Sequence, residues 1–173
     1  MISPKELIDY FIECSLTFYS GVPDSLTFKL CNFIEDFAKV DNSPITFLPA
    51  AHEGIAVSFA IGNFLATGRP GIVFMQNAGL GNTVNPIVSI ADKEVFNIPI
   101  ILLVGWRGHP GTQDEPQHSL QGRITQTLLS EMGFKTIILN KEWDVNKIRK
   151  LNIFEELQEH SLKIAFLFER GAV

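Results

Sequence analysis

The chain has 173 residues, of which 46% are hydrophobic and 19% charged, and its formal net charge is −5. This composition is typical of a globular domain with its own core and excludes a disordered chain. The acidic balance and the scattered Lys and Arg residues argue against a nucleic-acid partner, because phosphate binding needs a basic face.

The cysteines and the lengths of the apolar runs indicate the cellular compartment in which the protein is expected. Cys14 and Cys31 have no spacing typical of a disulfide framework or a metal site, so we expect small buried side chains in a reducing compartment. No basic segment precedes an apolar stretch at the start, and no apolar run reaches about 18 residues. We therefore expect a cytoplasmic protein without a membrane partner.

Helices and short β-rich runs alternate along the chain. Ser3, Pro4 and Glu6 provide a cap, a first-turn proline and a third-position glutamate for the first helix. The loop 105–117 is long for a compact domain, which indicates a functional role. In chain order we predict helix 4–15, strand 16–20, helix 24–39, strand 46–48, helix 53–67, strand 71–76, a helix from the glycine loop to 90, strand 98–104, helix 119–132, strand 136–139, helix 143–159 and strand 163–168.

This alternation predicts one α/β domain over residues 1–173, with a doubly wound, mostly parallel six-stranded sheet and helices on both faces. Ligands of such sheets bind at the carboxyl ends of the strands. Asp24, Glu53, Gln76 and Arg107 each follow one of the first four strands. We expect these side chains to gather at one edge of the sheet.

Glu53 is the first candidate for a functional residue. It and Arg69 are the only formal charges between Asp41 and Asp92, and Arg69 belongs to a predicted exposed turn. A carboxylate in apolar surroundings is costly unless something specific binds it. The alternative is a helix N-terminal charge that faces the macrodipole.

The helix predicted over 53–67 carries no charge after Glu53, and its apolar residues lie on every face. A helix that is apolar all round is buried on all sides. We expect it to lie in a subunit interface, as a contact between two copies of the chain. Burial inside the monomer is the alternative.

Two sequence motifs are only weak evidence for a nucleotide-binding loop and for a metal site. The segment Gly79–Val84 lacks the third glycine of the dinucleotide fingerprint, so it is either a tight turn or a ligand contact. The segment His109–His118 holds two histidines and two acids, but its prolines give no helical ligand register. We expect no metal ligands in this chain.

Five segments together carry a family resemblance, in the right order and spacing over about residues 16–139. They are Gly21-Val22-Pro23-Asp24-Ser25, Ala51-His52-Glu53-Gly54, Leu65-Ala66-Thr67-Gly68, Met75-Gln76-Asn77-Ala78-Gly79-Leu80-Gly81-Asn82, and Gly105-Trp106-Arg107-Gly108 through Asp114-Glu115-Pro116-Gln117-His118. The set resembles the phosphonopyruvate and sulfopyruvate decarboxylases, which are thiamine-diphosphate enzymes. His52 and Ala78 depart from the family's usual Asn and Ser.

The resemblance implies the pyrimidine-binding domain of a 2-oxo acid decarboxylase. The implied reaction converts 3-phosphonopyruvate to phosphonoacetaldehyde and CO₂, with a sulfopyruvate decarboxylase alpha subunit as the alternative. The family's Gly-Asp-Gly motif is absent, so a partner domain or beta subunit is expected to hold Mg²⁺ and the diphosphate. A different class, a non-catalytic interaction or regulatory subunit, stays open.

The resemblance also assigns roles to the residues that act in proton transfer. Glu53 is implied to hydrogen-bond N1′ of the aminopyrimidine and to favour its 4′-imino form, which promotes deprotonation of the thiazolium C2. Asp24 and His118 are implied to transfer protons around the bound intermediate. The alternatives are helix capping for Asp24 and solvent contact for His118.

Further residues are implied to contact the cofactor or the substrate. The expected pyrimidine pocket is lined by Val22, Pro23, Gln76 and Asn77. Arg107 and Gln117 are expected at the substrate, since Arg suits tetrahedral oxyanions. An ion pair of Arg107 with Asp114 or Glu115 is the alternative. We expect Trp106 at the edge of the site and Trp143 in packing only.

Overall fold

The computed structural model describes residues 1–152, 154–155, 157 and 161–173. Within these residues one sheet of six parallel strands has the order β2-β1-β3-β4-β6-β5. This confirms the predicted doubly wound parallel sheet, whose first three strands lie on one side of β4 and last two on the other. The strands are β1 (Phe18–Gly21), β2 (Thr46–Pro49), β3 (Gly71–Gln76), β4 (Ile100–Gly105), β5 (Phe134–Leu139) and β6 (Lys163–Phe168).

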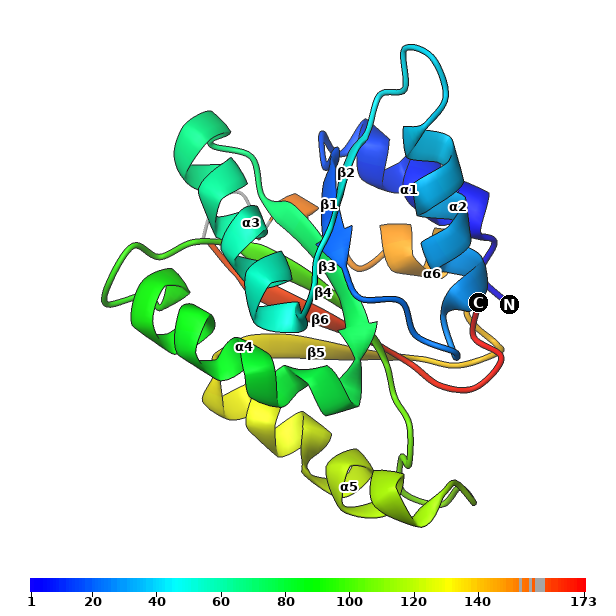
Figure 1. Ribbon diagram of the computed structural model, residues 1–173. Coiled ribbons are helices and arrows are strands. Elements are labelled where there is room, and N and C mark those ends of the chain that lie inside the picture. Colours follow the sequence, from blue (N-terminus) through cyan, green and yellow to red (C-terminus); the bar gives the residue numbers. More distant parts are fainter. Residues whose placement is uncertain (153, 156, 158–160) are drawn as a thin grey trace.

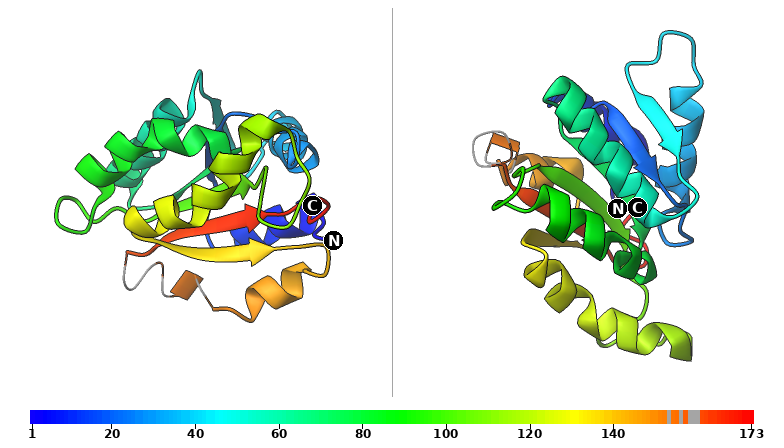
Figure 2. Two further views of the ribbon diagram at one scale, coloured as in Figure 1. Left: turned by 90° about the horizontal axis from the view of Figure 1, so that it is seen from below. Right: turned by 60° about the vertical axis from the view of Figure 1, so that its left-hand side comes forward.

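Helices cover both faces of the sheet, as predicted (Figure 1). One face carries α3, α4 and α5, and the other carries α1, α2 and α6 (Figure 2). The helices are α1 (Pro4–Glu13), α2 (Phe28–Ala38), α3 (Glu53–Thr67), α4 (Leu80–Pro86), α5 (Pro116–Glu131) and α6 (Val145–Arg149), with the 3₁₀ turn η1 (Asn77–Gly79) and the π-helical turn η2 (Ile87–Ala91).

The central strands divide the core into two apolar layers. Along β4, Ile101 and Leu103 pack with α1, α2 and α6, whereas Leu102 and Val104 pack with α3 and α4. This follows from the period of two in a strand, since successive side chains point to opposite faces. Apart from Gln76 at the end of β3 and Lys163 at the start of β6, the residues of β3, β4 and β6 are therefore apolar or glycine, which is why these strands are recognisable in the sequence.

Several predicted helix boundaries are wrong. Helix α2 begins at Phe28 and α5 already at Pro116, so the loop before α5 is shorter than predicted. The helix predicted to end near 90 is split into η1, α4 and η2. The helix predicted over 143–159 is interrupted, because α6 ends at Arg149 and Asn152 has a φ of 48°, although residues 154, 155 and 157 are again helical. Residues 153, 156 and 158–160 of that prediction lie outside the described residues.

Helix α3 matches its predicted bounds, and the described residues leave part of its apolar surface uncovered. It ends where Gly68 adopts a left-handed conformation, with a φ of 72°. Its outer face is open in the single chain, where Phe59 is 38% and Leu65 is 59% exposed. Among the described residues, no element therefore covers this apolar face, and the predicted contact with a second copy of the chain stays a prediction.

The structure also bears on packing predictions made from single residues. Cys31 is buried and Cys14 half-buried, and neither forms a disulfide. Trp143 packs against the core, as predicted. Within the described part of the chain, no helix combines the length and the apolar character needed to cross a bilayer.

Candidate functional site

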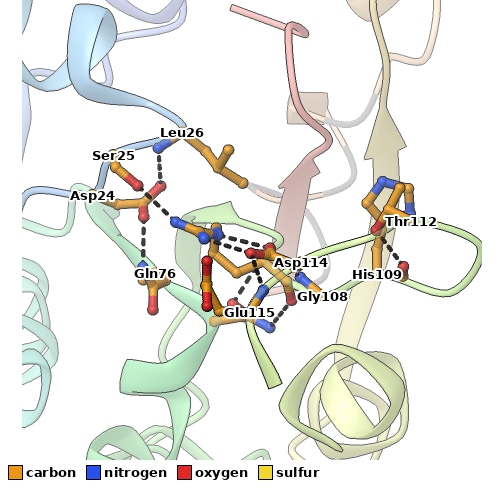
Figure 3. Close-up of polar contacts among 11 residues, drawn as sticks. Asp24, Ser25, Leu26, Gln76, Gly108, His109, Thr112, Asp114 and Glu115 are labelled. Carbon is orange, nitrogen blue, oxygen red and sulfur yellow. Dashed lines mark hydrogen bonds and ion pairs between the residues drawn. The ribbon is translucent and has the colours of Figure 1, made fainter. Parts of the chain in front are cut away.

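Three of the predicted site residues meet at the carboxyl edge of the sheet (Figure 3). Gln76, at the end of β3, donates from Nε2 to Oδ1 of Asp24, which follows β1, over 2.9 Å. Arg107, which follows β4, donates from Nη1 to the Ser25 hydroxyl over 3.1 Å. The expectation that side chains after three adjacent strands gather at one edge is confirmed for this group.

Asp24 is buried, with 4% of its surface exposed, and its carboxylate closes a tight turn. Oδ2 accepts hydrogen bonds from the backbone N–H groups of Leu26 (2.9 Å) and Thr27 (3.3 Å). The same oxygen lies over Gly105, where a Cβ would overlap it. Asp24 therefore organises the turn before α2 rather than standing at its N-terminus, and its proton-transfer role stays a prediction.

Arg107 and Asp114 form a two-bond ion pair that closes the loop after β4 (Figure 3). Arg107 Nε lies 2.7 Å from Asp114 Oδ2, and Nη2 lies 2.5 Å from Oδ1. Asp114 also accepts from the backbone N–H groups of Gly108 and Glu115. The hydrogen bonds from Arg107 hold the pKa of Asp114 far below its usual range and raise that of the guanidinium. The ion-pair alternative for Arg107 is thus present in the structure.

Asn77 holds the loop after β4 against the end of β3. Its Nδ2 donates to the Arg107 carbonyl and to the Thr125 hydroxyl, both over 2.9 Å. Its Oδ1 accepts the Arg107 backbone N–H over 3.1 Å. Because the amide is buried and used on both sides, Asn77 acts here as a positioning residue for the loop.

Glu53 begins α3 and is half-buried next to the glycine turn. Its Oε2 accepts from Asn82 Nδ2 over 2.8 Å. Its other carboxyl atoms lie over Gly79, where any Cβ would overlap them. Among the described residues, nothing hydrogen-bonds Oε1 or links Glu53 to the Asp24 and Arg107 network.

The surroundings of Glu53 are open. The neighbouring residues Pro23, Ala51, Ala78 and Asn82 are all exposed. A carboxyl with one anchored oxygen and one uncommitted oxygen, on an open margin of the protein, suits a ligand that carries a hydrogen-bonding ring nitrogen. The glycine turn therefore makes room for the Glu53 carboxyl, and a ligand contact by Gly79–Val84 stays a prediction.

His52, a departure from the resembled family, caps α3. Its Nδ1 accepts the backbone N–H of Gly54 over 3.1 Å, as an N-cap side chain does. Asn is among the favoured N-cap residues, so the substitution keeps the capping contact.

Removal of this cap is expected to weaken the start of α3. We expect His52→Ala to lower the free energy of unfolding by about 1 kcal/mol, because the Gly54 N–H loses its acceptor. His52→Asn is expected to keep most of that stability. Urea denaturation of the three proteins measures the difference, and equal stability of His52→Ala and the unsubstituted chain would refute the cap.

The remaining predicted residues are dispersed around this edge. Val22 donates its backbone N–H to the Phe74 carbonyl over 3.0 Å, and Pro23 is exposed. Gln117 is exposed in the first turn of α5, and the His118 backbone packs on Gly108. Among the described residues, no hydrogen bond or ion pair joins the Gln117 or His118 side chain to the Asp24 and Arg107 network.

Trp106, which was predicted at the edge of the site, precedes Arg107 and is buried. It donates its indole N–H to the Gly122 carbonyl over 2.9 Å. The anchoring roles of Asn82 and Thr125 were missed, since nothing in sequence spacing links them to Glu53 or Asn77. No cluster of three His, Cys, Asp or Glu that could hold a metal ion occurs in the residues described.

Comparisons with known proteins agree with this fold. Residues 5–132 match the family model described as thiamine pyrophosphate enzyme, N-terminal TPP binding domain. A solved 2-oxoglutarate:ferredoxin oxidoreductase from Magnetococcus marinus covers 99% of this chain at 15% identity and a TM-score of 0.65, and the chain covers 29% of it. At that identity the structural likeness shows the fold alone.

Curated relatives are more similar in sequence. A phosphonopyruvate decarboxylase of Streptomyces hygroscopicus is 32% identical over the whole chain, and one of Streptomyces viridochromogenes is 33% identical over the whole chain. The chain spans 41% and 42% of these relatives' lengths. A sulfopyruvate decarboxylase subunit alpha of Methanothermobacter thermautotrophicus is 31% identical over 72% of this chain and 78% of its own length.

Proposed function

We propose that this chain is the pyrimidine-binding half of a 2-oxo acid decarboxylase. The premise is that the chain belongs to the thiamine pyrophosphate enzymes, as their N-terminal TPP binding domain. The proposed reaction converts 3-phosphonopyruvate to phosphonoacetaldehyde and CO₂, because both Streptomyces relatives carry that activity in their names and match the whole chain. Sulfopyruvate is the alternative substrate, supported by the match to an alpha subunit.

The main support for the proposal is the position of Glu53. Asn82 fixes one carboxyl oxygen, Gly79 leaves room for the carboxyl, and the other oxygen has no described partner. These residues fit an aminopyrimidine, with Glu53 holding or sharing a proton at Oε1. Val22, Pro23 and Gln76 would border the ring, and Asn77 would keep that border in place. The cofactor, when bound, supplies the electron sink for decarboxylation.

Other residues would bind the substrate and move protons. Arg107 binds Asp114 through its Nε and Nη2 edge, which leaves N–H groups at Nη1 and Nη2 for a substrate oxyanion. Gln117, exposed at the start of α5, would add an amide contact. Asp24 and His118 are the proposed proton-transfer groups, Asp24 with its carboxylate oriented by Gln76.

The proposed enzyme needs a second domain or subunit. The chain has no Gly-Asp-Gly motif and spans 41% to 42% of its Streptomyces relatives. We propose that a diphosphate-binding domain or beta subunit holds the diphosphate and Mg²⁺ against the open side of Glu53. The protein is proposed to act in the cytoplasm on a small 2-oxo acid.

Decarboxylation assays on the assembled protein test this function. We expect the chain together with its diphosphate-binding partner to release CO₂ from 3-phosphonopyruvate only with thiamine diphosphate and Mg²⁺, and the chain alone to be inactive. Sulfopyruvate, assayed in parallel, distinguishes the two substrates. Absence of cofactor binding in a titration of the complex would favour a non-catalytic regulatory subunit instead.

We also propose that the exposed face of α3 contacts a second copy of the chain. Phe59 and Leu65 expose apolar surface there, and exposed apolar patches mark interaction sites. We expect Phe59→Glu to shift the assembled enzyme to smaller species, because a charge would be buried without a partner. Phe28→Glu, on α2 at the opposite face, is the matched control. Unchanged mass of Phe59→Glu in light scattering would contradict this contact.

A further inference from the structure

A cavity of about 200 Å³ lies beside the candidate site, between the loop after β4 and Arg170, which follows β6. In Figure 3, His109 and Thr112 lie on one side of Asp114, whereas Asp24, Ser25 and Gln76 lie on the other. The lining includes Leu26 and Asp114 from the candidate site but not Gln76 or Asp24. The cavity therefore adjoins the candidate site at the same edge of the sheet and extends from it to Arg170.

The cavity has one available positive charge. The exposed Arg170 contributes to its lining, and no residue in the described part of the chain forms an ion pair or hydrogen bond with its guanidinium. Asp114 also lines the cavity, but Arg107 and two backbone N–H groups bind its carboxylate oxygens. The negative charge of Asp114 is compensated locally, whereas the positive charge of Arg170 is not.

The polar wall of the cavity is held in place by its own contacts. The His109 ring lies against the buried Trp106, with the ring centroids 5.4 Å apart. The Thr112 hydroxyl donates to the His109 carbonyl over 2.7 Å, which fixes the turn between them. Gln113 adds an exposed amide to the lining. The lining of the cavity thus includes an imidazole and an amide in addition to the Arg170 guanidinium.

We propose that this cavity binds a small tetrahedral oxyanion, namely a phosphate, phosphonate or sulfonate group, with Arg170 as its cation. A guanidinium matches such groups because it donates two parallel hydrogen bonds. The apolar side of the cavity, formed by Leu26 and Trp106, leaves room for a short carbon chain attached to the oxyanion. The occupant can therefore be free inorganic phosphate or a small organic phosphonate, and neither depends on the proposed decarboxylation.

NMR titration of the 173-residue chain with inorganic phosphate tests the site. We expect saturable shifts of the Trp106 indole N–H and of the His109 resonances. Arg170→Gln is expected to weaken binding by about tenfold or more, because a charge-assisted hydrogen bond is lost, and Arg170→Lys to restore part of it. Arg123→Gln, which removes the same charge from an exposed position on α5, should leave binding unchanged.

The outcomes separate the proposal from its rivals. No saturable shift at Trp106, or one that persists unweakened in Arg170→Gln, would overturn the site. A parallel titration with 3-phosphonopropionate distinguishes the sources: clearly tighter binding than phosphate identifies an organic phosphonate, and equal binding identifies free phosphate. Failure of the proposed function would be seen in the decarboxylation assay and leave these titrations unaffected.

Discussion

Replacing Glu53 with Gln in the assembled enzyme is expected to lower turnover by about 10²- to 10⁴-fold, the range typical for loss of a positioned proton-transfer group. Gln has the same shape and can still contact Asn82, but its amide cannot hold or share the proton that the carboxyl would carry. The loss should appear in kcat, because the substrate contacts assigned to Arg107 are untouched. Steady-state kinetics with 3-phosphonopyruvate measure it.

The controls for this variant separate chemistry from structure. Glu94→Gln makes the same chemical change at an exposed position and should keep full activity. Size-exclusion chromatography and thermal unfolding should show that Glu53→Gln assembles and folds normally, since Glu53 is at the half-buried margin of α3. Near-normal turnover of Glu53→Gln would end the proposal that this carboxyl activates the cofactor.

Asp114→Ala is expected to lower the free energy of unfolding by about 2–3 kcal/mol. The side chain of Asp114 is only 8% exposed, and its carboxylate accepts bonds from Arg107, Gly108 and Glu115. Removing it leaves a largely buried guanidinium and two backbone donors without their acceptor. Chemical denaturation compares the variant with Glu115→Ala, whose exposed side chain accepts none of these bonds and should have a small effect.

The effect of Asp114 should depend on pH with a definite sign. Its pKa in the folded chain is held below the ordinary value of 3.8, chiefly by the hydrogen bonds from Arg107. A depressed carboxyl pKa contributes stability that is complete above the unfolded-state value and is lost as the pH falls toward the folded-state value. The stability difference between the unsubstituted chain and Asp114→Ala should therefore be constant near neutral pH and shrink below about pH 4. A difference that grows on acidification would contradict the ion pair.

The sheet was predictable because its central strands are buried on both faces. The runs 72–75 and 164–168 are continuously apolar, and the strands 71–76 and 163–168 that contain them were predicted with their observed bounds. The bounds of α3 were also predicted, with Gly68 as the signal that ends the helix, whereas the His52 cap was found only in the structure. In each case a local signal and the tertiary environment favour the same structure.

The errors arose where one local pattern suits two structures. Asp24 can cap a helix or close a turn with the N–H groups of Leu26 and Thr27, and the structure forms the turn. The run 143–159 has helical periodicity, but the positive φ of Asn152 interrupts it. The apolar face of α3 is exposed in the single chain, so the predicted contact with a second copy stays a prediction.

Site residues were easier to find than the contacts that position them. Glu53, Asp24 and Arg107 stood out by charge and by their place after strands. The bonds from Asn77 to Thr125 and from Asn82 to Glu53 join residues 48 and 29 positions apart. Such pairings depend on how α3, η1 and α5 pack together, which local sequence patterns do not encode.

The placement of β2 at the edge of the sheet has a consequence for how the protein is controlled. β2 pairs only with β1, its side chains are mostly exposed, and Glu53 follows it after three residues. Local opening of such an edge requires much less free energy than global unfolding. Hydrogen exchange at the amides of β2 and of the first turn of α3 should thus be faster than at β3 or β4. A partner that covers α3 would slow this exchange, so assembly would regulate the lifetime of the ordered carboxyl as well as complete the site.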